Sequence, residues 1–261
     1  MGALDQPDIE LSNQGHLLMR NGDQQKGLEL IKQAAFNGQP NAISTYNWHL
    51  ILKGQFEEAI SITEKLVPVA VAWIEKEAQR LNKSWGINKQ EVTLYINSYL
   101  YQIYNMQSNA AVAYLATGKV KDAMEMWEEA AEKCNHLEAR FYPIFHDGQK
   151  SPDLMLRLLT KEFTKEELQN LVSTMVDVST GGKGWFADWA KAGLNILQQA
   201  AKKTKYANNA GPISNVAASS AATFGAGYVA SKAAREYIQD QSLDSVESGE
   251  GAFDWLGDFF N

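Results

Sequence analysis

Small and large apolar residues recur along the first half of the chain at the spacing of two packed helices. One stretch has small residues at Gly15, Gly27 and Ala34 and large ones at Leu18 and Ile31, with Gly22 between them. A second stretch repeats the residue types at the same offsets: Ala111, Tyr114, Gly118, Ala123, Trp127 and Ala130. Small residues let helices approach closely, and large ones fill the gaps. The pattern predicts helical pairs over residues 8–38 and 104–134, each turning at its central glycine.

A less regular copy, with Asn47, Leu50, Gly54 and Ala59, follows the first and predicts a further pair over 41–66. It has Asn47, Thr63 and Leu66 where the other copies have a small, a bulky and a small residue. These units resemble the tetratricopeptide repeat family of helical repeats. The resemblance implies that each pair buries its apolar face against its neighbours. It also implies protein–protein recognition in a concave groove lined by the first helix of each pair.

The resemblance assigns a groove lining to first-helix side chains of mixed apolar and weakly polar character. They are Ser12, His16, Met19, Ser44, Trp48, Ile51, Ser108, Val112 and Leu115. This set lacks the Lys, Arg and Asn residues with which some family members bind an acidic C-terminus. A ligand of that chaperone type is therefore disfavoured.

Residues 67–103 separate the second and third copies and predict an inserted helical segment. Pro68 is well placed to open a new helix, with Val69, Val71 and Trp73 after it. The following tyrosine-rich run, 94–104, fits a helix or a strand, and its neighbours favour a helix. Its tyrosines suit either a core with hydroxyls at its edge or an interface.

The sequence after 136 predicts a smaller helical region. Residues 136–150 are typical of a linker that ends the repeats. Ser151 and Pro152 predict a helix start, Thr164 to Glu167 form a capping box, and a glycine cluster at 181–184 precedes a helix over 185–203. That cluster lacks the spacing and the Lys-Ser/Thr pair of a phosphate-binding loop, so a hinge explains it.

A last helix, predicted over 213–239, carries small residues every four positions: Ala218, Ala222, Ala226 and Ala230, continuing to Ala234. A ladder of this kind lets another helix backbone come close. It fits a tightly packed or self-associating helix, whereas its Ser, Thr and Asn residues disfavour membrane insertion. Membrane contact stays the less favoured alternative.

An acidic tail, 240–261, completes the sequence given. Its composition predicts disorder. Aromatic and apolar residues gather near its end: Phe253, Trp255, Leu256, Phe259 and Phe260. If this segment forms a helix, its apolar residues have the spacing seen in peptides that bind in a groove through one helix face. Docking onto a partner and docking back onto the chain's own body are equally compatible with it.

Charge and candidate chemistry narrow the function classes. The net charge of −7 arises after Arg235, where seven acidic residues and no basic ones occur, so the body is neutral and offers no basic face for nucleic acid. One cysteine, Cys134, fits a reducing compartment, and the start of the chain has no secretory signal. The four histidines have no metal-ligand spacing, and no acid–base pair stands out.

The sequence as a whole predicts an all-α protein without cofactor or metal. We expect helical repeats with an inserted segment over 1–145, a helical region with an Ala/Gly-rich last helix over 146–239, and an acidic aromatic tail over 240–261. The predicted function is a cytoplasmic, non-catalytic adaptor or scaffold that binds a protein or peptide, with the tail as a second docking element. A self-assembling or membrane-associated structural protein using helix 213–239 is the alternative.

Overall fold

The computed structural model describes residues 7–83 and 89–204, and this part of the chain folds into ten helices without strands. The prediction of an all-α protein is confirmed. Three helical pairs come first: α1 (Pro7–Arg20) with α2 (Gln24–Phe36), α3 (Pro40–Leu52) with α4 (Phe56–Asn82), and α5 (Lys89–Ala116) with α6 (Val120–Cys134). Each pair turns where the sequence predicts. The central glycines there have positive φ, as Gly54 shows with φ 74°.

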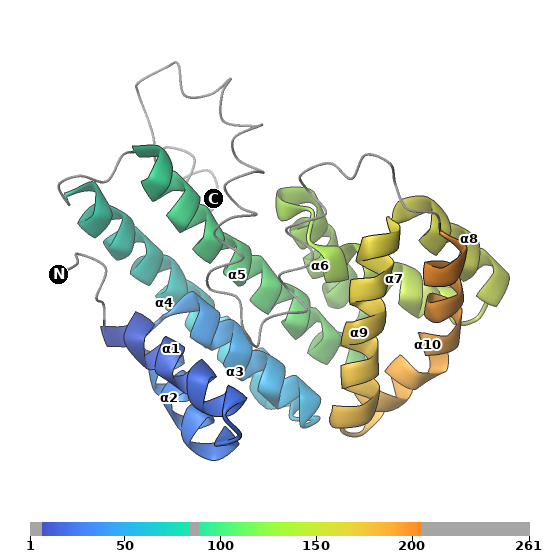
Figure 1. The fold of residues 1–261 in the computed structure, drawn as a ribbon, viewed down its shortest axis with the longest axis horizontal. Coiled ribbons are helices and arrows are strands. Elements are labelled where there is room, and N and C mark those ends of the chain that lie inside the picture. The colour runs from blue at the N-terminus through green and yellow to red at the C-terminus, as the bar shows by residue number, and fades with distance from the viewer. Residues whose placement is uncertain (1–6, 84–88, 205–261) are drawn as a thin grey trace.

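Four further helices complete the described part of the chain: α7 (Leu137–Gly148), α8 (Pro152–Glu162), α9 (Lys165–Gly181) and α10 (Trp185–Lys203). In Figure 1, α5 runs between α1–α4 on one side and α6–α10 on the other. Helix α9 packs along α10, and α8 contacts both α7 and α10. Helix α10 also touches α3 and α5, which connects the end of the described chain to its first half.

The predicted start signals of the later helices are confirmed. Helix α8 begins at Pro152, and α10 has the predicted bounds. At α9, the Thr164 hydroxyl accepts from the Glu167 backbone N–H while the Glu167 carboxylate accepts from the Thr164 N–H, which completes the capping box. The signals succeed because they act within one turn of helix and need no distant contact.

Two local predictions are wrong. Pro68 does not open a helix but lies inside α4, which continues beyond it to Asn82. An internal proline costs roughly 3 kcal/mol, and burial of side chains such as Trp73 and Ile74 on the same helix outweighs that cost. Residues 67–83 and 89–103 therefore lengthen α4 and α5, which pack against each other. The helical prediction for the tyrosine-rich run is confirmed, with Tyr99 and Tyr104 buried.

The predicted linker is the second error, since residues 137–148 form α7. Phe141, Tyr142 and Phe145 recur at helical spacing and are buried. The predicted boundary between residues 145 and 146 falls within this helix. The predicted helix 213–239 and the tail lie outside the described residues.

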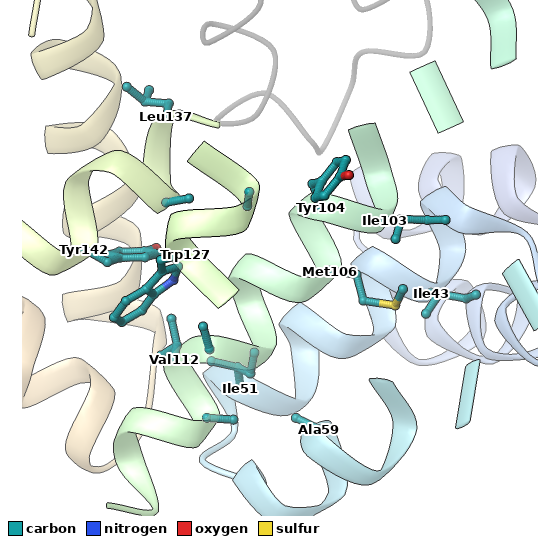
Figure 2. Close-up of a cluster of buried hydrophobic side chains, with 14 of the residues drawn as sticks. Ile43, Ile51, Ala59, Ile103, Tyr104, Met106, Val112, Trp127, Leu137 and Tyr142 are labelled. Carbon is teal, nitrogen blue, oxygen red and sulfur yellow. The ribbon is translucent and has the colours of Figure 1, made fainter. Parts of the chain in front are cut away.

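A continuous hydrophobic core joins the helices. Figure 2 shows Ile43 and Ile51 of α3 facing Met106 and Val112 of α5, with Trp127 of α6 farther along the same cluster. All five are fully buried. Within residues 7–83 and 89–204, none of the helices combines the length and the apolar character needed to cross a bilayer.

Candidate functional site

The nine predicted groove side chains lie on α1, α3 and α5, the first helices of the three pairs. Seven of them are buried: Ser12, Met19, Ser44, Ile51, Ser108, Val112 and Leu115. His16 and Trp48 keep partial exposure. Buried side chains offer a partner no surface, so the seven are part of the interior as the helices pack here and do not line an open groove.

Direct packing of the first helices explains this burial. The His16 Nε2 atom lies 3.0 Å from the Thr45 hydroxyl, which links α1 to α3. The Asn105 amide donates to the Ser44 hydroxyl at 2.7 Å, which links α5 to α3. Two of the polar side chains assigned to the groove, His16 and Ser44, instead hydrogen-bond across helix interfaces.

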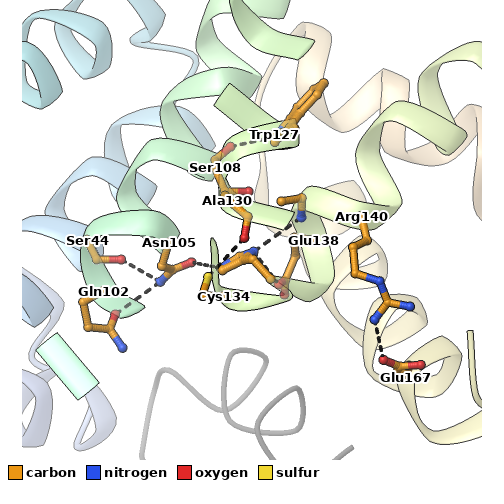
Figure 3. A network of polar contacts seen from close by, with 12 residues as sticks. Ser44, Gln102, Asn105, Ser108, Trp127, Ala130, Cys134, Glu138, Arg140 and Glu167 are labelled. Carbon is orange, nitrogen blue, oxygen red and sulfur yellow. Dashed lines mark hydrogen bonds and ion pairs between the residues drawn. The ribbon is translucent and has the colours of Figure 1, made fainter. Parts of the chain in front are cut away.

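A buried polar network continues from this contact to α7 (Figure 3). His136 is fully buried at the N-cap of α7, where its Nδ1 accepts from the Ala139 backbone N–H. The proton therefore lies on Nε2, which is 3.2 Å from the Asn105 carbonyl oxygen and donates to it. Burial lowers the pKa of His136 to about 3. The ring is neutral, and its 3.5 Å approach to Glu138 is not an ion pair.

This network predicts that acid weakens the fold through His136. A folded-state pKa of about 3 lies below the ordinary 6.5, so the neutral ring's contribution is complete above pH 6.5 and is lost as the pH falls toward 3. Between pH 7.5 and 5.0 we expect this residue to lower the free energy of unfolding by about 2 kcal/mol. Urea unfolding at the two pH values measures the change.

His136→Asn is the matched variant, because asparagine caps helices without titrating. We expect its stability to fall less over the same pH interval, while the other titrating groups contribute equally to both proteins. An identical pH dependence in the two proteins would contradict the assignment.

Partly exposed aromatic side chains gather where the second pair meets α10. We call Trp48, Phe56, Trp185 and Phe186 the aromatic corner. Trp48 and Phe186 meet edge to face with ring centroids 5.6 Å apart, and Phe56 meets Trp185 in the same way at 6.2 Å. Trp185 is 36% exposed, Trp48 and Phe56 are partly exposed, and Phe186 is buried.

The backbone fixes this corner. The Lys183 N–H, in the connection between α9 and α10, donates to the Leu52 carbonyl at the end of α3 with a distance of 2.8 Å. Gly54 follows in its left-handed conformation, and a Cβ atom there would come within 3.7 Å of the Lys183 carbonyl oxygen. The α3–α4 turn and the α9–α10 connection are thus in direct contact, although most of the described chain separates them in sequence.

A chain of aromatic contacts supports the corner from inside. Trp185 stacks on Trp189 at 5.5 Å, and Trp189 packs against Phe145 and Tyr142 of α7. Tyr142 in turn contacts Trp127 of α6 at 5.4 Å. The exposed ring of Trp185 therefore rests on a packed interior, an arrangement that keeps its orientation fixed.

The charged groups nearest in sequence to the corner have both signs. Lys53 and Lys183 are exposed, and among the described residues neither has an ion-pair partner. Glu57 and Glu58 lie in the first turn of α4, where carboxylates offset the partial charge of the helix end.

The described residues bear on two kinds of candidate chemistry, metal binding and thiol reactivity. They contain no group of three or more His, Cys, Asp and Glu side chains placed to hold a metal ion. Burial raises the pKa of Cys134 to about 12, and its thiol donates to the Ala130 carbonyl. Such a thiol is protonated and unreactive at neutral pH.

Sequence reasoning found one member of the corner, Trp48, and missed its three partners. Trp185 and Phe186 fall within the helix predicted over 185–203, and nothing in the sequence pairs them with α3 or α4. The predicted docking residues of the tail and the alanine ladder lie outside the described residues. No family model matches the chain, and no curated protein or solved structure matches it at a significant level.

Proposed function

We propose that this protein is a non-catalytic adaptor of the cytoplasm that binds a segment of a partner protein on a platform of three tetratricopeptide-like helical pairs. The proposed contact surface is the aromatic corner, and the tail from 240 onward carries a second docking element. The observation that supports this most is the 36% exposure of Trp185, whose ring contacts those of Phe56 and Phe186. Tryptophan in a rigid setting is the residue type most often found to dominate protein interfaces.

The burial of most first-helix side chains also favours this surface over the groove expected from the sequence. A partner that reached Ile51 or Val112 would have to separate α3 from α5, whereas Trp185 is accessible without any rearrangement. The partner is proposed to be protein because rings and isolated lysines suit a peptide, while phosphate-rich nucleic acid needs an extended basic face.

Trp185→Ala is expected to weaken partner binding at least tenfold, because truncating a central interface tryptophan commonly costs about 2 kcal/mol or more. The measurement is quantitative co-purification with the tagged full chain, followed by titration of each protein whose recovery depends on Trp185. Thermal unfolding of the variant checks that the fold is kept.

Leu154→Ala is the matched control. Leu154 is another exposed apolar side chain, 43% exposed on α8 and outside the corner. Equal recovery of every partner by wild type, Trp185→Ala and Leu154→Ala would reject the corner as a binding surface. Equal loss in both variants would show general surface stickiness and would reject it too.

A further inference from the structure

The aromatic corner has features that fit a segment of this chain itself. Its rings with exposed surface are those of Trp48, Phe56 and Trp185, and exposed Lys53, Lys183, Glu57 and Glu58 lie near them in sequence. The α9–α10 connection that carries Lys183 is hydrogen-bonded to the end of α3, next to Lys53, so the backbones of these two lysines lie close together. A ligand with aromatic rings and carboxylates can pack on these rings and pair with the two lysines.

Residues 253–260 have this composition. The segment reads Phe-Asp-Trp-Leu-Gly-Asp-Phe-Phe, with four aromatic rings, two carboxylates and no basic residue. Among the residues outside the described part, aromatic and acidic side chains alternate this closely only here.

We infer that residues 253–260 dock on the aromatic corner of the same chain and compete there with the partner segment. This inference rests on the proposed function, because it takes the same surface as the binding site. The aromatic side chains of the segment pack against Phe56 and Trp185, and Asp254 and Asp258 lie near Lys53 and Lys183.

The chain is long enough for this docking. The described part ends at Thr204, directly after α10, and α10 begins at the corner with Trp185. A helix of 19 residues is about 28 Å long. The connecting stretch 205–252 would cover about 40 Å even as a random coil. The segment can therefore return to the corner.

Tethering also makes the intramolecular contact competitive. A linked segment acts at an effective concentration near the millimolar range, so even a weak peptide occupies its site much of the time. Gly257 disfavours a preformed helix in the segment, which keeps the contact weak enough for a partner to displace it. The expected consequence is higher affinity of the partner for a chain whose segment is altered.

Disulfide trapping in the full chain tests the docking. One variant combines the substitution Gln55→Cys, beside Phe56, with Asn261→Cys, directly after the segment. The control variant combines Glu75→Cys with Asn261→Cys. Glu75 is exposed on the same helix as Phe56 but about 28 Å away from it, so a segment docked on the corner should not reach it. Native Cys134 stays in both variants, since its high pKa keeps it protonated.

Under mild oxidation we expect the Gln55 variant to form an intramolecular disulfide at least tenfold faster than the Glu75 variant. Lys53→Glu with Lys183→Glu is expected to slow it, and Asp254→Lys with Asp258→Lys to restore it. Equal rates at the two sites, or disulfides only between two chains, would overturn the inference. If trapping fails while Trp185→Ala still loses the partner, the corner stands and only the occupant is wrong.

Discussion

Gly193→Ala is expected to lower the free energy of unfolding by about 3 kcal/mol, at the upper end of the cost of overpacking a core. A Cβ atom at this position of α10 would overlap the Phe145 ring of α7. That ring is fully buried and held between Phe141 and Trp189, with ring centroids 4.9 and 4.7 Å away. Because the ring is buried and contacted by two other rings, the added methyl group is expected to displace it or to push α10 and α7 apart.

Gly181→Ala is the matched control, because a Cβ atom there meets nothing within 4 Å. Its effect is expected to be within about 0.5 kcal/mol. Urea unfolding of both variants, followed by circular dichroism, gives the two free energies. Similar stability for Gly193→Ala and Gly181→Ala would contradict the packing of α10 on α7.

The second large effect on stability is expected from substitutions at Asn47 and Thr63. These two residues differ in type from those at the same positions of the other two helical pairs. The Asn47 amide donates to the Ala59 carbonyl and to the Thr63 hydroxyl, at 2.9 and 2.8 Å, in a buried setting. In the first pair the same two positions are Gly15 and Ile31, and a Cβ atom on Gly15 would lie 2.8 Å from the Ile31 side chain. The first helical pair thus packs a small residue against a large one at these positions. The second pair instead has two medium-sized residues joined by a hydrogen bond.

Asn47→Ala and Thr63→Ile are each expected to destabilise the protein by about 2 kcal/mol, the first by leaving a cavity and the second by crowding Asn47. The double variant restores the small–large arrangement. We therefore expect it to be more stable than the sum of the single effects by at least about 1.5 kcal/mol.

A double-mutant cycle in urea measures this coupling. The comparison cycle pairs Asn47→Ala with Thr160→Val on α8, whose hydroxyl bonds only within its own helix. That pair is expected to be additive within about 0.5 kcal/mol. Additivity of Asn47→Ala with Thr63→Ile would show that the two residues do not compensate each other.

Much of the helical framework could be predicted from the sequence, because turns and caps depend on neighbouring residues. The glycine turns and the Thr164 capping box are of this kind. Pro68 and the segment 137–148 were misjudged because tertiary burial overrides a local breaking signal. The side chains of Trp73 on α4 and Phe145 on α7 are stabilised by partners far along the chain, and no local pattern contains that information.

The site was less predictable, for a related reason. A first-helix residue such as Ser44 has the weak polarity expected of a groove lining, yet a hydrogen bond can satisfy its hydroxyl equally well in a helix interface. The Ser44 hydroxyl accepts from Asn105, whereas the Ser108 hydroxyl is buried without a hydrogen-bond partner among the described residues. Trp48 lies on the third helix and Trp185 opens the tenth, and one sequence has no signal that connects them.

The contact between Leu52 and Lys183 joins two segments that the ribosome makes at different times. Trp48 and Phe56 emerge from the ribosome together with the second helical pair, but Trp185 and Phe186 follow only when most of the described chain has been made. At a synthesis rate of about 5–20 residues per second, the intervening stretch of roughly 130 residues takes roughly 6–26 seconds to make. A nascent chain therefore presents uncovered aromatic side chains to its surroundings well before the finished protein can close over them.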